Sequence, residues 1–578
     1  MSRAAGAALL ILAVNLAVYA PTLAHSFVWD DHEQVVDNAH LRDWKSFPEF
    51  WKTDILSLSR AGQARSNYYR PLFYVQYLLY YKAFGLHAAA WHGMAILQHY
   101  LACLASWAFL RRLRLSFEVS VSAALLFAVH PAHGESVSWI AAAFNDPPAA
   151  TASLLALAAY ALWMRGGRAR HAALAAAGFA VALCLKESAL AGLFLSPLVA
   201  WYVGRDVPLP PRRKLGRALA GYAPWLLVAV CYFAVRMRAV LDPFGMSPGA
   251  PSLLSVLPTF PVLVLFYVRL LLWPWGLSPS YPLRYLTDWR VPVVGLSLAG
   301  LVLLFLAAGW ATRGRPVLRF AALWTACALA PALNVFSFRE YYLVHQRYLY
   351  LSVLGLCLAV AWSLAATVAE PSTRRVILGA LVVLWSTSTI YHDRFWASDT
   401  ALWRRIAEVD PGNAAAFDWL GGRAREAGDL DAAEALFRRS LAADASSPLG
   451  ARNMAVLLHL RRGNAALALP YYEQALQAFR RLEPRYHDEH LSTRINYGVC
   501  LDQVGRYDDA LRTFLDVGRT PPHPAAAFRN AAVLLQREGR TGEVEAVLSE
   551  GIAWHPEDVA LSRMRADSRR QARPRSTP

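Results

Sequence analysis

Two adjacent carboxylates, Asp30 and Asp31, are the residues whose placement in this sequence most strongly suggests chemistry. They follow residues 4–24, an apolar run long enough to cross a hydrocarbon core of roughly 30 Å as a helix, so both acids are expected at the water edge. Phe27 and Trp29 precede them, and interfacial aromatic side chains hold a helix end at a fixed depth. Such a pair is either the hydrated end of a helix or a functional site that exchanges protons.

The composition places this acid pair in a polytopic membrane protein. Of 578 residues, 56% are hydrophobic and 20 are tryptophan, and the apolar runs stop near Ile390, so a soluble part is expected after them. The formal net charge of +17 gathers in short basic loops between the runs, which is typical of cytoplasmic loops and implies no nucleic acid partner. Five of the six cysteines lie in apolar runs, which gives no disulfide framework.

The apolar runs predict about eleven membrane crossings. Together with residues 4–24 they are 87–110, 117–130, 148–164, 171–185, 188–204, 218–235, 291–310, 320–337, 349–369 and 376–391. Residues 257–277 are interpreted as a re-entrant or tilted segment, because a crossing there would put the basic residues near 313–319 on the wrong side. For the first run a cleavable signal peptide is the alternative, but the run is longer than a usual signal sequence.

The first loop, residues 25–70, is acidic and is expected on the outer face. Arg3 is the only charged side chain before Asp30, so the positive-inside bias keeps the N-terminus in the cytoplasm. Residues 44–51 predict a helix lying on the membrane surface, and residues 72–84 predict a second interfacial helix. The expected topology brings the C-terminal region to the side of Asp30. Six cations fall on the same side: Arg70, Lys186, Arg236, Arg238, Arg339 and Arg347.

The soluble part repeats itself. Gly428, Gly463, Gly505 and Gly539 are spaced by 35, 42 and 34 residues, and each precedes an amphipathic helical pattern. This period is typical of tetratricopeptide repeats, which form an α-solenoid with a concave binding face. We therefore predict an all-α chain, with a multi-span membrane domain over residues 1–395, a repeat domain over 396–566 and a disordered basic tail over 567–578. Helical hairpins without a groove are the alternative.

Several further motifs occur in order along nearly the whole chain. They are residues 27–31, Tyr69-Arg70-Pro71-Leu72, residues 130–137 (His-Pro-Ala-His-Gly-Glu-Ser-Val), Lys186-Glu187, residues 331–334 (Pro-Ala-Leu-Asn), residues 346–351 (Gln-Arg-Tyr-Leu-Tyr-Leu) and the repeats. In this order they resemble the transmembrane and tetratricopeptide-repeat-containing proteins of animals and their bacterial relatives. That family belongs to the GT-C glycosyltransferases, multi-span enzymes that take a sugar from a polyprenyl-phosphate donor; its animal members are O-mannosyltransferases.

The resemblance implies roles for the candidate residues. Asp30 or Asp31 matches the catalytic acid pair, one carboxylate of which would accept the proton of an attacking hydroxyl. Cations would bind the donor phosphate, with Arg347 and Lys186 favoured because they lie in family-like motifs. Arg70, Arg236 and Arg238 are further phosphate candidates, although the last two could simply snorkel and Lys186 could instead be neutralised by Glu187. The expected substrate-binding residues are His130, His133, Glu135, Asp146, Tyr348 and Tyr350.

Some residues depart from the family pattern. Bacterial relatives often show Glu-Arg-Lys-Asp where this chain has Ala-Phe-Asn-Asp at 143–146, so Asp146 is kept and two cations are lost. Gln346 stands where relatives often have Asp. If the lost cations hold donor phosphate in relatives, this protein uses others, binds a different donor or is inactive. His130, His133 and Glu135 could also ligate a metal, but Pro131 interrupts them; a divalent metal is not expected, and no other cofactor is predicted.

The resemblance thus predicts a membrane enzyme that transfers a mannose-like hexose, with inversion, from a polyprenyl-phosphate donor to Ser or Thr hydroxyls of secreted or periplasmic proteins bound by the repeats. Two alternatives remain. One is a non-catalytic membrane-anchored repeat scaffold for an envelope complex, and the other is a GT-C enzyme acting on a glycolipid or polysaccharide. The Ala- and Arg-rich composition favours a bacterial inner membrane, with the acidic loop and the repeats in the periplasm.

Overall fold

The structure is a computed structural model that describes residues 2–58, 66–240, 252–333, 343–482 and 486–572. Every regular element in these residues is helical, which confirms the all-α prediction. Contacts divide the chain into two compact units, residues 1–409 and 410–578. Helix α17 (Asp399–Val409) belongs to the first unit. Asn334, the last residue of one family-like motif, and Arg339, one of the expected outer-face cations, lie outside the described residues.

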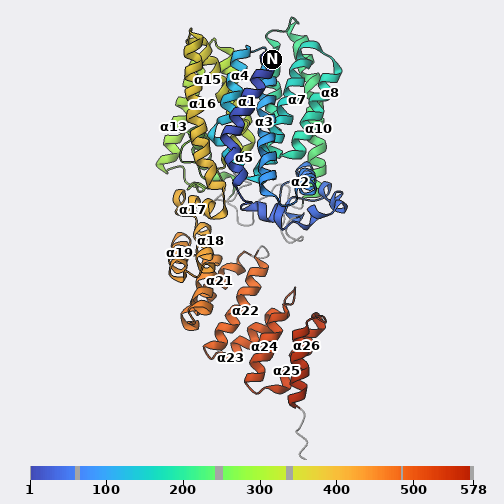
Figure 1. The fold of residues 1–578 in the computed structure, drawn as a ribbon, viewed down its shortest axis with the longest axis vertical. Helices are drawn as coiled ribbons and strands as arrows, with labels where there is room; N and C mark the ends of the chain where they lie inside the picture. Colours follow the sequence, from blue (N-terminus) through green and yellow to red (C-terminus); the bar gives the residue numbers. More distant parts are fainter. Residues whose placement is uncertain (1, 59–65, 241–251, 334–342, 483–485, 573–578) are drawn as a thin grey trace, which may run out of the picture. The chain divides into compact units, whose positions relative to one another are not determined.

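The first unit is built from apolar helices (Figure 1). They are α1 (Arg3–Tyr19), α2 (Pro71–Phe84), α3 (Ala88–Arg112), α4 (Phe117–Val129), α5 (Gly134–Ser138), α6 (Ile140–Ala143), α7 (Asp146–Gly166), α8 (Ala169–Leu185), α9 (Gly192–Gly204), α10 (Pro211–Ala239), α11 (Leu253–Val256), α12 (Thr259–Leu272), α13 (Pro292–Ala311), α14 (Pro316–Leu329), α15 (Val353–Thr367), α16 (Pro371–Asp393) and α17. Several begin with proline, whose missing N–H costs nothing in a first helical turn.

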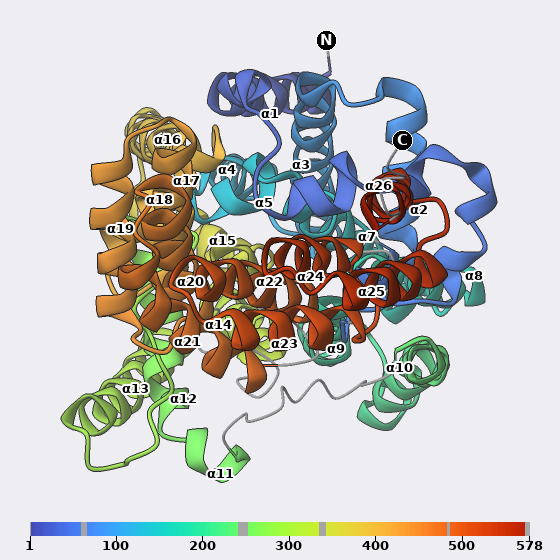
Figure 2. The ribbon, with the colours of Figure 1, turned by 90° about the horizontal axis from the view of Figure 1, so that it is seen from below.

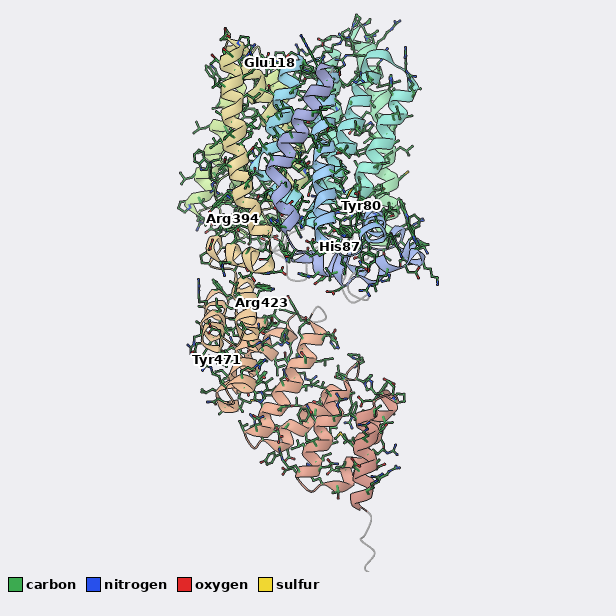
Figure 3. All side chains as sticks on the ribbon, viewed as in Figure 1. Tyr80, His87, Glu118, Arg394, Arg423 and Tyr471 are labelled. Carbon is green, nitrogen blue, oxygen red and sulfur yellow. The ribbon has the colours of Figure 1, made fainter. Side chains whose placement is uncertain are left out.

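Eight helical segments are long and apolar enough to cross a membrane, and α4, α8, α12 and α15 are shorter apolar helices. A helix lies at each predicted span, and the chain is an integral membrane protein. Close packing depends on small residues: a Cβ on Gly178 of α8 would lie 3.0 Å from the Cβ of Ala156 of α7. Figure 3 shows Glu118 at one end of this helical unit and Tyr80, His87 and Arg394 at the other.

The loop between α1 and α2 differs from the prediction. No long surface helix forms in its described residues; short 3-10 turns at Trp44–Ser46 and Glu49–Trp51 replace it. Pro48 accounts for the difference, because it has no N–H to continue a helix and its ring clashes with the preceding turn. The expected helix at 72–84 is present as α2. Of the uncertain segment 257–277, α12 forms the helical part.

The second unit consists of successive helix pairs (Figures 1 and 2). They are α18 (Ala414–Glu426) with α19 (Leu430–Ala443), α20 (Pro448–Val456) with α21 (Ala465–Arg480), α22 (His487–Gln503) with α23 (Tyr507–Gly518), and α24 (Ala525–Arg537) with α25 (Thr541–Trp554), followed by α26 (Val559–Ala572). The four predicted turn glycines all have positive φ, between 68° and 84°, which favours glycine. Residues 567–572, predicted as tail, belong to α26, and 573–578 lie outside the described residues.

Candidate active site

Asp31 is a buried support of the acidic loop. The backbone N–H of Val28 donates to Asp31 Oδ2 (3.1 Å), and the N–H of Ala141, in α6, donates to Oδ1 (2.8 Å). Its side chain is fully buried, and burial raises the pKa of Asp31 well above its usual range although the two N–H bonds oppose the rise. Because both oxygens are bonded to backbone, Asp31 ties the loop to α6.

Asp30 lies in different surroundings from its neighbour. Its side chain is half-buried, whereas that of Asp31 is inaccessible to solvent. Trp29, immediately before it, has φ 55°, a conformation that bulky side chains rarely adopt. The chain therefore bends sharply between Val28 and Asp30, and the two adjacent acids do not share one environment.

Arg347 is linked to the acidic loop by aromatic rings. Its backbone N–H and its guanidinium donate to the two oxygens of Glu135, at 3.2 Å each, and His345 Nδ1 lies 3.0 Å from Glu135 Oε1. The guanidinium lies 4.9 Å from the ring centre of Trp139, which stacks on Trp29 at 5.0 Å. Glu135 was predicted to bind substrate. It is fully buried and accepts hydrogen bonds from the predicted phosphate-binding arginine.

Lys186 forms a buried ion pair with Asp146, and each side chain is 5% exposed. Burial lowers the pKa of Lys186 to about 8. The second carboxylate oxygen of Asp146, Oδ2, is buried without a hydrogen-bond partner among the described residues. Lys186 and Glu187 do not neutralise each other, because Glu187 binds Arg70 Nε at 2.7 Å. Adjacent side chains in this extended turn point in different directions.

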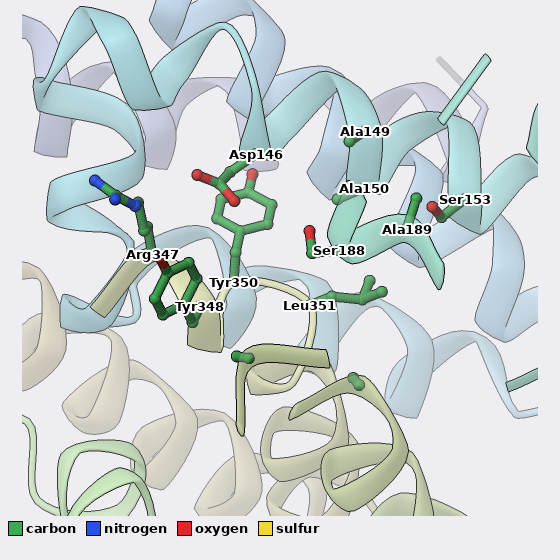
Figure 4. A pocket seen from close by; sticks show the side chains of 12 residues that line it. Asp146, Ala149, Ala150, Ser153, Ser188, Ala189, Arg347, Tyr348, Tyr350 and Leu351 are labelled. Atoms are coloured by element: carbon green, nitrogen blue, oxygen red, sulfur yellow. The ribbon is translucent and has the colours of Figure 1, made fainter. Parts of the chain in front are cut away.

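A small pocket opens beside these charges (Figure 4). Its polar end contains Asp146, Arg347, Tyr348 and Tyr350, and its other end is lined by small and apolar side chains. The lining residues are Asp146, Ala149, Ala150, Ser153, Ser188, Ala189, Ala328, Ala332, Arg347, Tyr348, Tyr350 and Leu351. The ring of Tyr348 lies 5.3 Å from the Arg347 guanidinium and 5.5 Å from Lys186 Nζ. The pocket thus joins a charged end to an apolar end.

The remaining predicted cations have different environments. Arg70 is paired with Glu187, which also accepts the Tyr69 N–H at 2.9 Å. Arg236 donates to the backbone carbonyl of Asn67 at 2.6 Å and so supports the loop that leads to Arg70. Arg238 is exposed near the end of α10. None of these three residues lines the pocket between the described helices.

The predicted histidines bond the protein backbone. His130 Nε2 lies 3.1 Å from the carbonyl of Leu271, and His133 Nε2 lies 3.2 Å from the carbonyl of Tyr350. Both rings are fully buried, so the structure shows them joining helices. Within the described ranges, no group of three His, Cys, Asp or Glu side chains is arranged to hold a metal ion.

Sequence reasoning missed Trp139, which contacts both Trp29 and Arg347, and Ser188, which lines the pocket. Trp139 lies two residues after one family-like motif and Ser188 directly follows another, and that proximity was the available signal. It also missed Asp399, which contacts the acidic loop. No motif marks this residue, which lies about 370 positions further along the chain.

Comparisons with known proteins give the family context. The family model for the tetratricopeptide repeat matches residues 448–517, which confirms the repeat prediction. The protein O-mannosyl-transferase TMTC4 of Homo sapiens is 24% identical over 482 residues, covering 74% of this chain and 65% of that protein. Human TMTC3, also named a protein O-mannosyl-transferase, is 23% identical over 71% of this chain and 48% of its own length. The chain therefore spans about two thirds or less of these relatives.

Two solved structures show remote similarity to this chain. The crystal structure of ArnT from Cupriavidus metallidurans bound to undecaprenyl phosphate is 18% identical, with a TM-score of 0.36 over 81% of this chain and 80% of that one. The oligosaccharyltransferase of Archaeoglobus fulgidus, tethered to an acceptor peptide, is 14% identical, with a TM-score of 0.35 over 74% of this chain and 58% of that one.

Proposed function

Because the chain is related to the transmembrane and tetratricopeptide-repeat-containing protein O-mannosyl-transferases, we propose that it is a membrane glycosyltransferase. The donor is a mannose-like hexose on a polyprenyl phosphate, and the acceptors are Ser and Thr hydroxyls of secreted or periplasmic proteins. The observation that carries the proposal is the stack of Trp29 on Trp139, whose ring centre lies 4.9 Å from the Arg347 guanidinium. This stack connects the acidic loop, which carries the half-buried Asp30, to Arg347 at the polar end of the pocket.

Asp30 is the proposed base, and Asp31 is its support. A base must approach the hydroxyl that it deprotonates within hydrogen-bond distance. Asp31 is fully buried with both oxygens bonded to backbone N–H groups, so it would have to leave its place to do so. Asp30 is half-buried and adjacent. This division gives each member of the pair one task.

The pocket suits the donor. A polyprenyl phosphate combines an apolar chain with an anionic head, and the pocket combines an alanine-lined end with Arg347. Lys186 lies near the same polar end through its pair with Asp146. In this proposal the sugar lies between that end and the acidic loop, and the Asp146 Oδ2 atom, which has no hydrogen-bond partner among the described residues, accepts a sugar hydroxyl.

The proposed reaction is a single displacement with inversion. The acceptor hydroxyl oxygen forms a bond to the anomeric carbon while the bond from that carbon to the phosphate oxygen breaks. The electron pair leaves with polyprenyl phosphate, whose added negative charge Arg347 stabilises. The hydroxyl proton passes to Asp30, and water later removes it. No proton donor to the leaving group is needed, because phosphate is a good leaving group.

The test is transfer of labelled mannose from polyprenyl-phosphate mannose to envelope proteins by the purified chain. Asp30→Asn keeps size and hydrogen bonding but removes the base, so activity should fall by on the order of 10²–10⁴-fold. Asp37→Asn, an exposed acid of the same loop, is the matched control and should retain activity. Full activity of the Asp30→Asn protein would refute the assigned base.

A comparison of cells with and without this chain separates the proposed function from the two alternative hypotheses. Cells lacking this chain should lose O-linked glycan from a few secreted proteins. Unchanged glycoproteins with an altered glycolipid or polysaccharide would instead identify a lipid or polysaccharide acceptor. Loss of an envelope complex with no glycan change would favour the scaffold.

A further inference from the structure

The chain segment after the last apolar helix binds the acidic loop directly. Ser26 donates through both its N–H and its hydroxyl to the carbonyl of Ala397, at 3.1 Å each. Asp399 Oδ1 accepts the N–H of Trp29 at 2.8 Å, and its Oδ2 lies 2.8 Å from Nε2 of His32. Asp399 therefore contacts the loop on both sides of Asp30.

Asp399 is available for this contact because a neighbour caps its helix. An acid at the start of a helix usually accepts N–H groups of its own first turn. In α17 the hydroxyl of Ser398 does so, accepting the N–H of Ala401 at 3.3 Å. Both oxygens of Asp399 are then directed to residues of the acidic loop. Helix capping alone does not account for its position.

The residue that Asp399 holds is the one in the unusual backbone conformation. A bulky residue at positive φ persists only where its surroundings determine the conformation, and such residues cluster at functional sites. At Trp29, with φ 55°, the surroundings are the Asp399 carboxylate on the N–H and two indole rings on the side chain. Trp139 stacks on it at 5.0 Å and Trp403 meets it edge-on at 6.1 Å. Trp403 belongs to α17, like Asp399.

We propose that Asp399 is a positioning residue for Asp30. It holds the backbone N–H of Trp29 before the base and the side chain of His32 after it, while Asp31 fixes the loop to α6. The inference rests on the proposed function for its effect on catalysis, but the contact itself is independent of any substrate. Asp399 bonds Trp29 and His32, and neither residue is among those that line the donor pocket, so its loss should change the chemical step more than donor binding.

The test compares Asp399→Ala, Asp399→Asn and Asp399→Glu by two measurements on the full chain. Amide hydrogen exchange in a peptide covering residues 26–33 reports the contact without any substrate. Transfer kinetics with polyprenyl-phosphate mannose report catalysis. Asp399→Ala should speed exchange at Trp29 at least tenfold and lower kcat at least tenfold, with the donor KM within twofold. Asp399→Asn keeps an acceptor for the Trp29 N–H and should recover most of both values, whereas the longer Asp399→Glu should not.

The control is Glu408→Ala, an exposed acid on the same helix that pairs with Arg405, three residues before it. It should leave exchange at 26–33 and kcat unchanged. Unchanged exchange in Asp399→Ala overturns the proposal even if Asp30 is the base. Faster exchange with unchanged kcat also overturns it. So does a fall in kcat that is accompanied by a rise in donor KM of the same factor. The Asp30→Asn variant is measured in parallel. If it keeps full activity, the assignment of Asp30 as the base is wrong, whatever the role of Asp399.

Discussion

At the residue scale, the cations of the site are partly neutralised before any substrate binds. Arg347 shares its charge with Glu135, and Lys186 is paired with Asp146. A phosphate would therefore be recognised by geometry as well as by net charge. Arginine suits this task, because its planar guanidinium can donate to Glu135 through one nitrogen and present other N–H groups to an anion.

Replacing Arg347 tests this geometry. Arg347→Lys keeps the charge but loses the fork and the flat face over Trp139, so the donor KM should rise by roughly tenfold or more, since one lost bidentate contact is worth about 1.5–3 kcal/mol. Arg238→Lys, at an exposed position, is the control and should have no effect. Equal donor KM values for Arg347→Lys and Arg347→Ala, with the fold retained, would show that Arg347 does not bind phosphate.

The surroundings of Lys186 change the effect expected of the Lys186→Arg substitution. From the sequence, Lys186→Arg is predicted to matter little, because the site needs only a point charge. The structure places Lys186 in a buried ion pair at 4% exposure, where a larger guanidinium must displace its neighbours. We therefore expect Lys186→Arg to lower thermal stability, measured as the unfolding temperature in detergent, more than it changes donor KM. The reverse pattern would indicate a direct phosphate contact.

At the element scale, the sequence predicts most helices but few of their contacts. Long apolar runs identify the spans, and regularly spaced glycines identify the repeat turns, because both signals are local. The surface helix at 44–51 was predicted wrongly, since aromatic density outweighed Pro48. The pairs Lys186–Asp146 and Arg70–Glu187 join residues 40 and 117 positions apart, so only the folded chain reveals them.

Helix α18 gives the repeat unit a pH-dependent stability. Asp418 is buried beside Ser447, and burial raises its pKa to about 6. Its pKa in the folded state thus exceeds the value of 3.8 that is usual for an aspartate, so the folded form binds the proton more tightly. The stability that this binding adds is present below about pH 4 and is lost as pH rises through 6. The loss by pH 7 is on the order of 2–3 kcal/mol.

This dependence can be measured as the urea midpoint for amide protection in α18 and α20 at pH 5 and pH 7.5. The midpoint should be lower at pH 7.5 in the natural chain. Asp418→Asn removes the titrating group and should give equal midpoints. Asp431→Asn, at a 93% exposed acid of α19, should leave the difference intact.

At the scale of the whole molecule, the repeats form a compact unit after α17. We propose that they bind acceptor proteins and so raise the local concentration of acceptor hydroxyls. Deleting residues 412–578 should then spare transfer of mannose to a short Ser/Thr peptide while transfer to natural envelope proteins falls by at least tenfold. An equal fall with both acceptors would show that the repeats serve the stability of the enzyme instead.

The bond between Asp399 and Trp29 also bears on the number of membrane crossings. It joins the residues just after α1 to those just after α16, which favours both helices ending on one side and an odd number of crossings for a chain that begins on the other side. If all eight long apolar segments of the described residues cross, an odd number of the four shorter helices crosses as well.

Three of the four shorter helices, α4, α8 and α15, have their two ends on opposite sides, as a crossing requires. The Glu118–Arg374 ion pair, 3.0 Å long, marks the far side at the starts of α4 and α16, and α15 ends just before that point. Helix α8 ends at Lys186, beside the site. We therefore propose that α4, α8 and α15 cross, which gives eleven crossings in the described residues, and that α12 enters and returns on one side. Cysteine labels placed at residues 37, 252 and 288 should therefore react with the same impermeant reagent, and a label at 118 should not.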